Sequence, residues 1–337
     1  MRSFEWVSAT SVADAVKQLQ VRKPPEDPDQ APRPMAGGQD LLTTMKDYVT
    51  RPVRVVNLKS IPGLDRIEAD PKGGLKIGAL VTIAQLEEHA DVRRKFPGLA
   101  EAAHSVATPQ IRNLGTVGGN LCQRPRCWYF RLEHVVCLRK GGDECYAESG
   151  ENKYNAILGG GPSFIVHPSD LAPMLVALEA TVSIAGPKGN RDLPLEKFFV
   201  LPSEDYRREN VLGPAEIITH VRVPASSFAS QSTYLKFKER ASLDFALSAV
   251  AAAIELGPDR KVRQARLVLG GVAPVPWRVP KVEEFLAGKA LEPATLAEAG
   301  KLALRGAEPL SKNGYKVALT QALVRRALAQ VGGVKEG

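Results

Sequence analysis

Cysteine is scarce in this sequence, and its scarcity excludes a disulfide scaffold. Only four of the 337 residues are cysteine, too few to staple a chain of this size through disulfides. No run of about 18 consecutive apolar residues occurs, so we expect no membrane-spanning helix. The N-terminal residues lack a charged stretch followed by an apolar one, so we also expect no signal peptide in this chain.

Two further absences exclude whole classes of binding protein. The net charge is +8, from 45 Lys and Arg against 37 Asp and Glu, but the basic residues are spread along the chain. No basic run is interleaved with aromatic residues, so we expect no nucleic-acid partner. Neither a G-x-G-x-x-G nor a P-loop pattern occurs, which leaves a Rossmann fold or an NTPase without support.

What is present is a mixture of helical and strand patterns, which predicts an α+β fold of two or three domains. Apolar periodicity predicts helices at 11–20, 83–95, 99–106 and 170–180, and from 281 to the end. Apolar and β-branched runs predict strands at 53–58, 75–83, 181–185 and 216–223. Residues 234–237, 245–256 and 262–269 predict a three-stranded antiparallel meander, although the Ala-rich middle segment also fits a helix.

Two glycine pairs are candidate binding loops. Gly37-Gly38 lies in MAGGQDLL, and Gly118-Gly119 lies in TVGGN. Adjacent glycines let the backbone approach a ligand closely, and their N–H groups can form a concave anion site. Each pair taken alone also fits an ordinary turn.

Three motifs in order resemble the FAD-binding subunit of the molybdenum hydroxylase family, which includes xanthine dehydrogenase. They are AGGQDLL at 36–42, QIRNLGTVGGN at 110–120 and HPSDL at 167–171. The resemblance implies a PCMH-type FAD-binding domain of two subdomains, at 1–58 and 59–224. It also implies a C-terminal domain at 225–337, with the three-stranded antiparallel sheet and helices.

The resemblance also implies which residues hold FAD. The two glycine loops would bind the pyrophosphate, largely through main-chain N–H groups, and Asp170 would bond the ribityl or ribose hydroxyls. Asp170 also fits the N-cap of the helix that follows it. Lys236 stands where the family has a lysine near the flavin, although Lys238 is close by. The cofactor residues so implied are Met35, Ala36, Gly37, Gly38, Gln39, Asp40, Thr116, Gly118, Gly119, Asn120, Asp170 and Lys236.

All four cysteines lie in one segment beside the second glycine loop, which we call the cysteine segment (residues 121–161). Cys122, Cys127, Cys137 and Cys145 have the spacing C-x4-C-x9-C-x7-C. Structural zinc sites usually use close C-x2-C-like pairs, which this spacing lacks. Four thiolates satisfy a [4Fe–4S] cluster, which therefore is the favoured prediction, with zinc or free or disulfide-bonded thiols as alternatives.

Nearby basic and aromatic residues fit the same hypothesis. The segment carries Arg124, Arg126, Arg131, Arg139 and Lys140, which would offset the charge of a four-thiolate cluster or form a solvated surface. Some members of the family carry a [4Fe–4S] cluster in such an insertion, and RPRCWYFR is similar to the aldehyde oxidoreductase type. The second type of family member with a [4Fe–4S] cluster in such an insertion is 4-hydroxybenzoyl-CoA reductase.

The resemblance implies an electron-transfer subunit with no catalytic side chain of its own. Its partners would be a molybdopterin-binding large subunit and a small subunit with [2Fe–2S] clusters, and electrons would pass through FAD to an external acceptor. There are two alternatives. In one, electrons enter at the [4Fe–4S] cluster, as in the reductase. In the other, the chain is a zinc-stiffened scaffold without redox function. His167 is expected to be a satisfied loop histidine or a contact of the flavin or cluster. We expect a cytoplasmic location, or a periplasmic one through a partner that carries an export signal.

Overall fold

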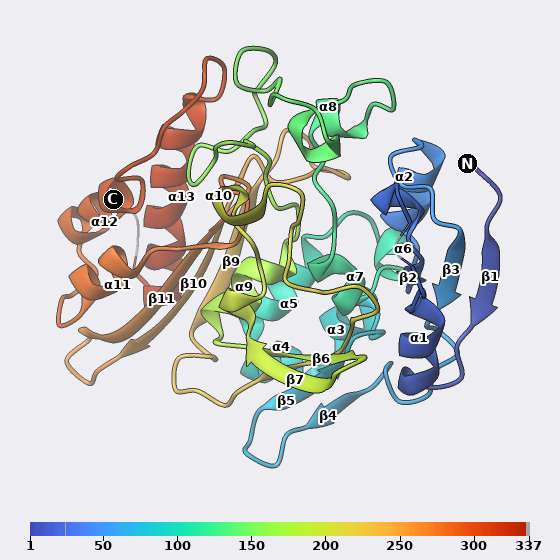
Figure 1. The fold of residues 1–337 in the computed structure, drawn as a ribbon. Coiled ribbons are helices and arrows are strands. Elements are labelled where there is room, and N and C mark those ends of the chain that lie inside the picture. Colours follow the sequence, from blue (N-terminus) through green and yellow to red (C-terminus); the bar gives the residue numbers. More distant parts are fainter. Residues whose placement is uncertain (24, 335–337) are drawn as a thin grey trace.

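The chain folds around three separate sheets that follow one another across the molecule (Figure 1). The computed structural model describes residues 1–23 and 25–334. The blue N-terminal part and the orange C-terminal part lie at opposite sides of the view, with the central sheet and its helices between them. The cysteine segment crosses the top of the molecule, where it carries α8.

The first sheet is parallel, with the order β1-β3-β2. Its strands are β1 (Glu5–Ser8), β2 (Arg33–Met35) and β3 (Arg54–Asn57). The accompanying helices are α1 (Val12–Leu19), η1 (Pro28–Gln30) and α2 (Leu41–Lys46). Ser11 caps α1 by accepting the N–H of Asp14 at 3.1 Å, and α1 buries Ala15, Val16 and Leu19. The helix predicted at 11–20 and the strand predicted at 53–58 are confirmed.

The central sheet is antiparallel, with the order β4-β5-β8-β6-β7. Its strands are β4 (Ile67–Ala69), β5 (Leu75–Gly78), β6 (Thr181–Gly186), β7 (Gly189–Pro194) and β8 (Ile217–Val223). The helices of this part are α3 (Ile83–Glu88), α4 (Ala90–Lys95), α5 (Pro97–His104), α6 (Pro109–Arg112), α7 (Val117–Leu121), α8 (Trp128–Arg131), η2 (Leu138–Lys140), α9 (Leu171–Ala177), η3 (Leu195–Lys197) and α10 (Pro202–Asp205).

Two boundaries in this part differ from the prediction. The strand predicted at 75–83 stops at Gly78, where the backbone lies so close to Leu64 that an added Cβ would be 2.1 Å from its carbonyl oxygen. The helix predicted at 83–95 is divided into α3 and α4, because His89 adopts an extended conformation with ψ 124°. Thr82 starts α3 through a capping box with Gln85.

The C-terminal sheet is antiparallel, with the order β12-β11-β10-β9. Its strands are β9 (Ser232–Phe237), β10 (Ser248–Leu256), β11 (Val262–Gly270) and β12 (Trp277–Arg278). The three predicted strands are confirmed, and the short β12 adds a fourth at the edge.

The Ala-rich segment is the strand β10, and its two faces explain its composition. Ala249, Ala251 and Ala253 face the central core, whereas Val250 and Ile254 face the core beneath the C-terminal helices. A strand buried on both faces reads as a continuous apolar run, so periodicity does not distinguish it from a helix.

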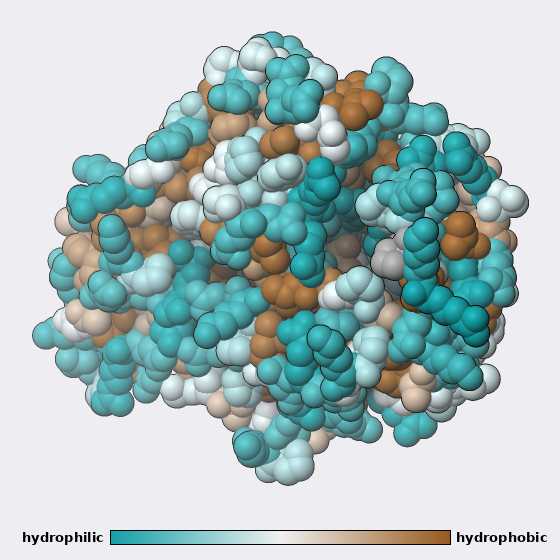
Figure 2. All heavy atoms as spheres, in the orientation of Figure 1, coloured by the Kyte–Doolittle hydropathy of each residue, from teal (hydrophilic) through white to brown (hydrophobic). Residues whose placement is uncertain are grey.

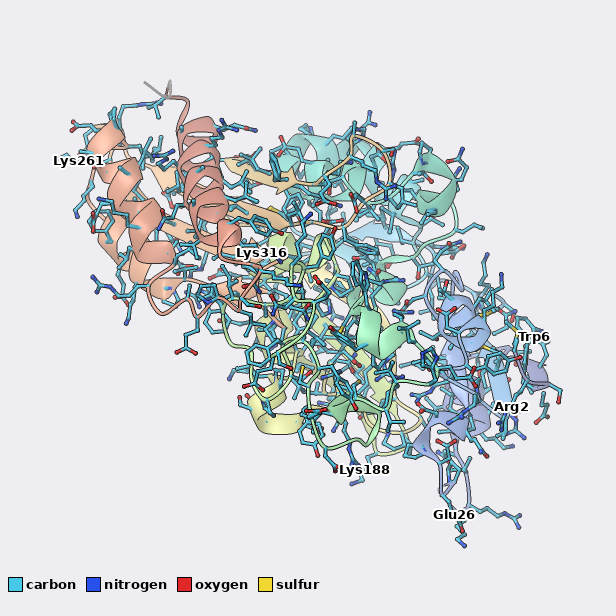
Figure 3. The ribbon with its side chains drawn as sticks, turned by 90° about the horizontal axis from the view of Figure 1, so that it is seen from above. Arg2, Trp6, Glu26, Lys188, Lys261 and Lys316 are labelled. Carbon is cyan, nitrogen blue, oxygen red and sulfur yellow. The ribbon has the colours of Figure 1, made fainter. Side chains whose placement is uncertain are left out.

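The C-terminal helices are α11 (Pro280–Leu286), α12 (Pro293–Ala303) and α13 (Tyr315–Gly332). Seen from above, Lys316 lies at the inner end of α13, toward the middle of the molecule (Figure 3). Its ammonium group is buried and donates to the carbonyls of Tyr154 at 2.9 Å and Gly271 at 2.8 Å, which ties the helix to the cysteine segment. Among the described residues, no helix is both long enough and apolar enough to cross a membrane.

Candidate functional site

The first glycine loop joins β2 to α2 and leaves its backbone donors free. Gly38 has a φ of 72°, a conformation that favours glycine. A Cβ on Gly37 would lie 1.9 Å from the carbonyl oxygen of Leu114, so this glycine lets the first loop pack against the chain before the second. Within the described chain, the main-chain N–H groups of residues 37–40 donate to no protein acceptor. The loop therefore offers a row of donors that an anionic group can use.

The second glycine loop is the start of α7, and its donors are already used. Thr116 caps the helix by accepting the N–H of Gly119 at 3.1 Å, and its carbonyl accepts the N–H of Asn120 at 2.8 Å. Gly118 donates to Ala79 at 2.9 Å, and a Cβ on it would meet the Ala79 side chain at 2.9 Å. The structure therefore differs from the implied pattern of free donors here, because helix capping and close packing satisfy them.

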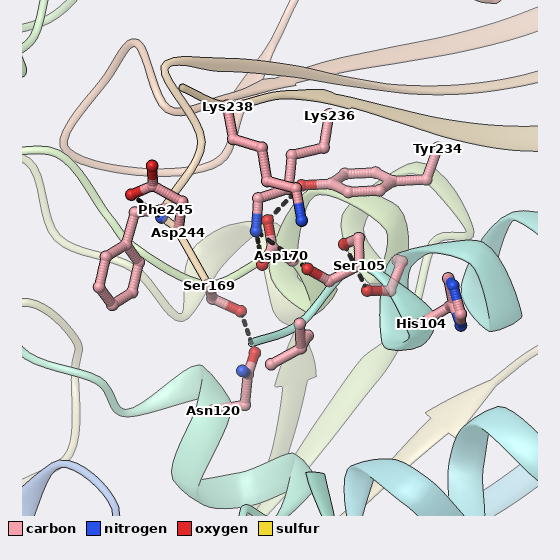
Figure 4. A network of polar contacts seen from close by, with 12 residues as sticks. His104, Ser105, Asn120, Ser169, Asp170, Tyr234, Lys236, Lys238, Asp244 and Phe245 are labelled. Atoms are coloured by element: carbon pink, nitrogen blue, oxygen red, sulfur yellow. Dashed lines mark hydrogen bonds and ion pairs between the residues drawn. The ribbon is translucent and has the colours of Figure 1, made fainter. Parts of the chain in front are cut away.

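Asp170 is the centre of a buried network that joins three elements (Figure 4). Its carboxylate accepts from the Tyr234 hydroxyl at 2.9 Å and from the Lys236 ammonium at 2.8 Å. Lys236 also donates to the carbonyl of Ser105 at 3.1 Å, whereas Lys238 donates to the carbonyl of Ser242. Burial raises the pKa of Asp170 above its ordinary value, against the opposing effect of the Lys236 charge.

The network continues into the second glycine loop. Ser169 donates its hydroxyl proton to the side-chain oxygen of Asn120. Its hydroxyl also accepts the N–H of Ala172 at 3.0 Å, so Ser169 caps α9. The carboxylate of Asp170 makes no capping bond, which corrects the prediction that Asp170 caps this helix. The capping role passes to Ser169 because Asp170 is held by Tyr234 and Lys236.

A cavity of about 290 Å³ lies beside this network. Its lining combines the cysteine segment, the 166–170 loop and the connection between β9 and β10. The residues are Arg126, Cys127, Trp128, Glu151, Lys153, Tyr154, Asn155, Val166, His167, Pro168, Ser169, Asp170, Tyr234, Glu239, Arg240, Asp244, Phe245, Ala246, Leu247 and Gly271. The cavity is lined by both apolar and charged side chains, and its size is suitable for part of a cofactor or for a small ligand.

His167 is buried in the wall of this cavity and is not a fully satisfied loop histidine. Its ring packs edge-on against Phe199, with centroids 4.7 Å apart. Its Nε2 has no partner in hydrogen-bond geometry within the described residues. Burial lowers the pKa of His167 to about 4, against smaller opposing effects of Glu209 and the main chain of Leu121. The imidazole is therefore neutral at pH 7.

Two carboxylates anchor the cysteine segment, and Asp40 is the first. It accepts the N–H of Arg124 at 2.7 Å and the guanidinium groups of Arg131 at 2.8 Å and Arg126 at 3.0 Å. The side chain of this predicted cofactor residue thus holds the cysteine segment against the first glycine loop.

Glu209 is the second anchor, and it binds the guanidinium groups of Arg124 and Arg139. Burial would raise the pKa of Glu209, but the two guanidinium groups outweigh burial and hold it below its ordinary value. Arg124, Arg126, Arg131 and Arg139 are therefore not a solvated surface, because they pair with Asp40 and Glu209. Four guanidinium groups share two carboxylates, so positive charge remains in this part of the cysteine segment.

Three of the four cysteines share a second, small cavity, and the fourth does not. Cys127, Cys137 and Cys145 line a space of about 10 Å³. Cys122 instead packs against the central core at the end of α7. Burial raises the pKa of the Cys122 thiol to about 12, and the charges of Glu209 and Asp40 add to this shift. Within residues 1–23 and 25–334, no three His, Cys, Asp or Glu side chains are arranged to hold a single metal ion.

Several site residues lay outside the sequence-based prediction. Tyr234 was missed, although it lies two residues before Lys236 on the same face of β9, which is a usable signal. Glu209 carries no signal in the sequence, because only the folded chain brings it to the cysteine segment. Ser163 lies two residues after that segment but was not singled out, since the prediction considered only cysteines as ligands.

Two known family models match this chain, one over its N-terminal two-thirds and one over its C-terminal part. Residues 2–226 match the family model described as the FAD-binding domain in molybdopterin dehydrogenase. Residues 232–331 match the model described as the CO dehydrogenase flavoprotein C-terminal domain. The two matches together extend over nearly the whole chain.

Individual relatives also match most of the length of this chain. The chain is 35% identical to the aldehyde oxidoreductase FAD-binding subunit PaoB of Escherichia coli, over 88% of this chain and 90% of that protein. It is 27% identical to the nicotinate dehydrogenase FAD-subunit of Eubacterium barkeri, over 88% of this chain and 83% of that protein. It superposes on a chain of the reconstituted CO dehydrogenase from Oligotropha carboxidovorans with a TM-score of 0.76, at 24% identity and 99% coverage of both chains, which shows a shared fold.

Proposed function

Because the chain belongs to the family of FAD-binding subunits of the molybdenum hydroxylases, we propose that it is the electron-transfer flavoprotein of an aldehyde oxidoreductase-type complex. The proposal includes an iron–sulfur cluster in the cysteine segment as well as FAD. The partners are a molybdopterin-binding large subunit and a small subunit with [2Fe–2S] clusters. The terminal acceptor is an external molecule.

The residues of the two candidate regions fit FAD. The free N–H groups of residues 37–40 suit the pyrophosphate, since backbone donors at a glycine loop stabilise negative charge. The 290 Å³ cavity suits the ring system, and its wall includes Asp170 and Tyr234 of the polar network. Bound FAD would supply the exchange between single electrons and electron pairs.

One observation carries the electron-transfer proposal: Cys127 lines both cavities. It contributes to the 290 Å³ cavity beside Asp170 and to the small cavity that it shares with Cys137 and Cys145. A cluster held by these thiols would therefore be a direct neighbour of the flavin site. Soft thiolates are the ligands that iron–sulfur clusters prefer.

The chain's own residues position and shield this site. Glu239, after β9, accepts the Tyr154 hydroxyl at 3.0 Å and binds the ammonium group of Lys153, so it joins the cysteine segment to the C-terminal part at the cavity rim. Trp128 packs near Tyr154, with ring centroids 5.6 Å apart. Neutral His167 and the Lys236–Asp170 pair set the polarity of the wall without forming a nucleophile–base pair.

The test is a count of flavin, iron and sulfide in the complex purified anaerobically, for wild type and Cys137→Ala. We expect FAD in both, and four more iron atoms in wild type than in the variant, since the partner's [2Fe–2S] iron is common to both. Flavin with equal iron in both samples would overturn the cluster and leave a flavoprotein subunit. A wild-type complex without flavin would overturn the electron-transfer role itself.

A further inference from the structure

The small cavity of the cysteine segment is lined by three cysteines and by a serine that can present an oxygen. Cys127 precedes α8, Cys137 precedes η2, and Cys145 lies in the loop that follows. The serine is Ser163, which lies beyond the cysteine segment. The remaining walls are formed by Tyr129, Phe130, Leu138, Arg139, Tyr146 and Ile165.

Ser163 is suited to this position because it is buried and uncommitted. The residue is 2% exposed, and no hydrogen bond of its hydroxyl is seen among the described residues. Its Oγ is not one of the fully buried polar atoms without a partner, which fits a hydroxyl that borders the cavity. A ligand in the cavity that it lines would supply the missing partner.

The other polar walls are less suitable. The Tyr129 hydroxyl already accepts the N–H of Glu151 at 2.6 Å, and Arg139 is cationic and paired with Glu209. Tyr146 is partly exposed, and its ring packs near that of Tyr129. Cys122 does not line the cavity and instead packs, partly buried, against the central core.

We propose that Cys127, Cys137 and Cys145 hold the iron–sulfur cluster and that Ser163 faces its fourth iron, with Cys122 a core residue. This inference rests on the proposed function, because it requires a cluster in the cysteine segment. An iron that faces a hydroxyl instead of a thiolate is bound by a harder and weaker donor, so it is the iron that leaves first. The cavity of about 10 Å³ has room for about one water, so loading the cluster requires these walls to move apart.

The test compares four anaerobic complexes: wild type, Cys122→Ser, Ser163→Ala and Ser163→Cys. Iron and sulfide are counted before and after mild ferricyanide oxidation, and the cluster is observed by electron paramagnetic resonance. We expect Cys122→Ser to match wild type, and Ser163→Ala to lose one iron and show the signal of a three-iron cluster. We expect Ser163→Cys to keep all its iron through an oxidation that removes one iron from wild type.

The opposite result is equally clear. If Cys122→Ser loses the cluster while Ser163→Ala keeps wild-type iron and its wild-type signal, Cys122 is the ligand and the inference fails. Flavin content and thermal unfolding distinguish loss of a ligand from misfolding. Cys122→Val is a second variant at this position, and it keeps an apolar side chain against the core. If wild type already lacks iron beyond that of the partner's clusters, the proposed function fails instead.

The matched control is Tyr146→Phe, which removes one of the two tyrosine hydroxyls of the residues that line the cavity and keeps the ring. We expect its iron count and oxidation behaviour to match wild type. Loss of one iron in Tyr146→Phe, with Ser163→Ala unaffected, would assign the fourth position to tyrosine and overturn the role of Ser163.

Discussion

The ammonium group of Lys236 lies 2.8 Å from the carboxylate of Asp170, and both side chains are almost completely buried. The pair joins β9 of the C-terminal sheet to the start of α9, 66 residues earlier in the chain. Through Ser169 and Asn120 the same network reaches the second glycine loop. The candidate flavin cavity is therefore built across the boundary between the two matched family regions.

Removal of Lys236 should be costly. Lys236→Met leaves the Asp170 carboxylate buried without its cation, so we expect a loss of about 3 kcal/mol in the free energy of unfolding and a lower flavin content. Lys238→Met is the matched control, since the Lys238 ammonium group donates to the carbonyl of Ser242 and its charge has a smaller effect on Asp170 than that of Lys236. Chemical denaturation and the flavin absorbance measure both. Equal effects of the two substitutions would contradict the assignment of Lys236.

Gly37→Ala should push the first glycine loop away from Leu114, which lies in the segment that precedes the second glycine loop. The added Cβ would lie 1.9 Å from the Leu114 carbonyl oxygen, so one backbone must move, at a cost of about 2 kcal/mol. We expect weaker FAD retention, measured by flavin release on dilution. Gly314→Ala is the control, because no atom lies within 4 Å of its added Cβ, and its stability should change by less than about 0.5 kcal/mol.

Asp40→Asn should loosen the cysteine segment selectively. The carboxylate binds three arginines of that segment, and the amide cannot replace these charge-assisted bonds. We expect faster hydrogen exchange at 121–161 and unchanged exchange in β10 and β11. Asp192→Asn removes an exposed ion pair with Arg222 and should change neither. Uniformly faster exchange over the whole chain would show that Asp40 supports global stability rather than this segment.

His167 should make the protein sensitive to acid. Its folded pKa of about 4 lies below the ordinary value of 6.5, so below pH 6.5 the unfolded state binds a proton that the folded state excludes. Stability therefore falls as the pH decreases from 6.5 toward 4, by about 2 kcal/mol between pH 7.5 and pH 5. His167→Gln should reduce this loss, whereas His104→Gln, at an exposed residue, should not. Denaturation curves at both pH values test this, and identical losses in wild type and His167→Gln would contradict it.

The exposed side chains of the cysteine segment include large apolar ones, whereas its anchored side chains are charged. Trp128, Leu132 and Val136 are exposed by 58%, 46% and 56%. Figure 2 shows hydrophobic surface over the region of α8 at the top of a mostly hydrophilic face. The anchors Asp40 and Glu209 lie on the inner side, so the segment is held by charge within and presents apolar side chains outward.

Local signals determined much of the fold and part of the site. Turn glycines, the Ser11 cap and apolar periodicity act over a few residues, so helices such as α1 and strands such as β3 and β11 were predictable. The division of 83–95 into α3 and α4 was not predictable, because the extended conformation of His89 depends on tertiary packing, which apolar periodicity does not show. The ordered motifs in 36–42, 110–120 and 167–171 were sufficient to identify the family.

The sequence by itself determined that the four cysteines are near one another in the chain and near a flavin motif. Only the tertiary structure decided that Cys127, Cys137 and Cys145 share a cavity with Ser163 and that Cys122 does not. It likewise decided that Asp40 binds Arg131, 91 residues away, and that Lys236 rather than Lys238 reaches Asp170. The physical reason is that helices and turns are set by neighbours in the chain, whereas a buried polar site is set by which distant groups satisfy one another when water is excluded.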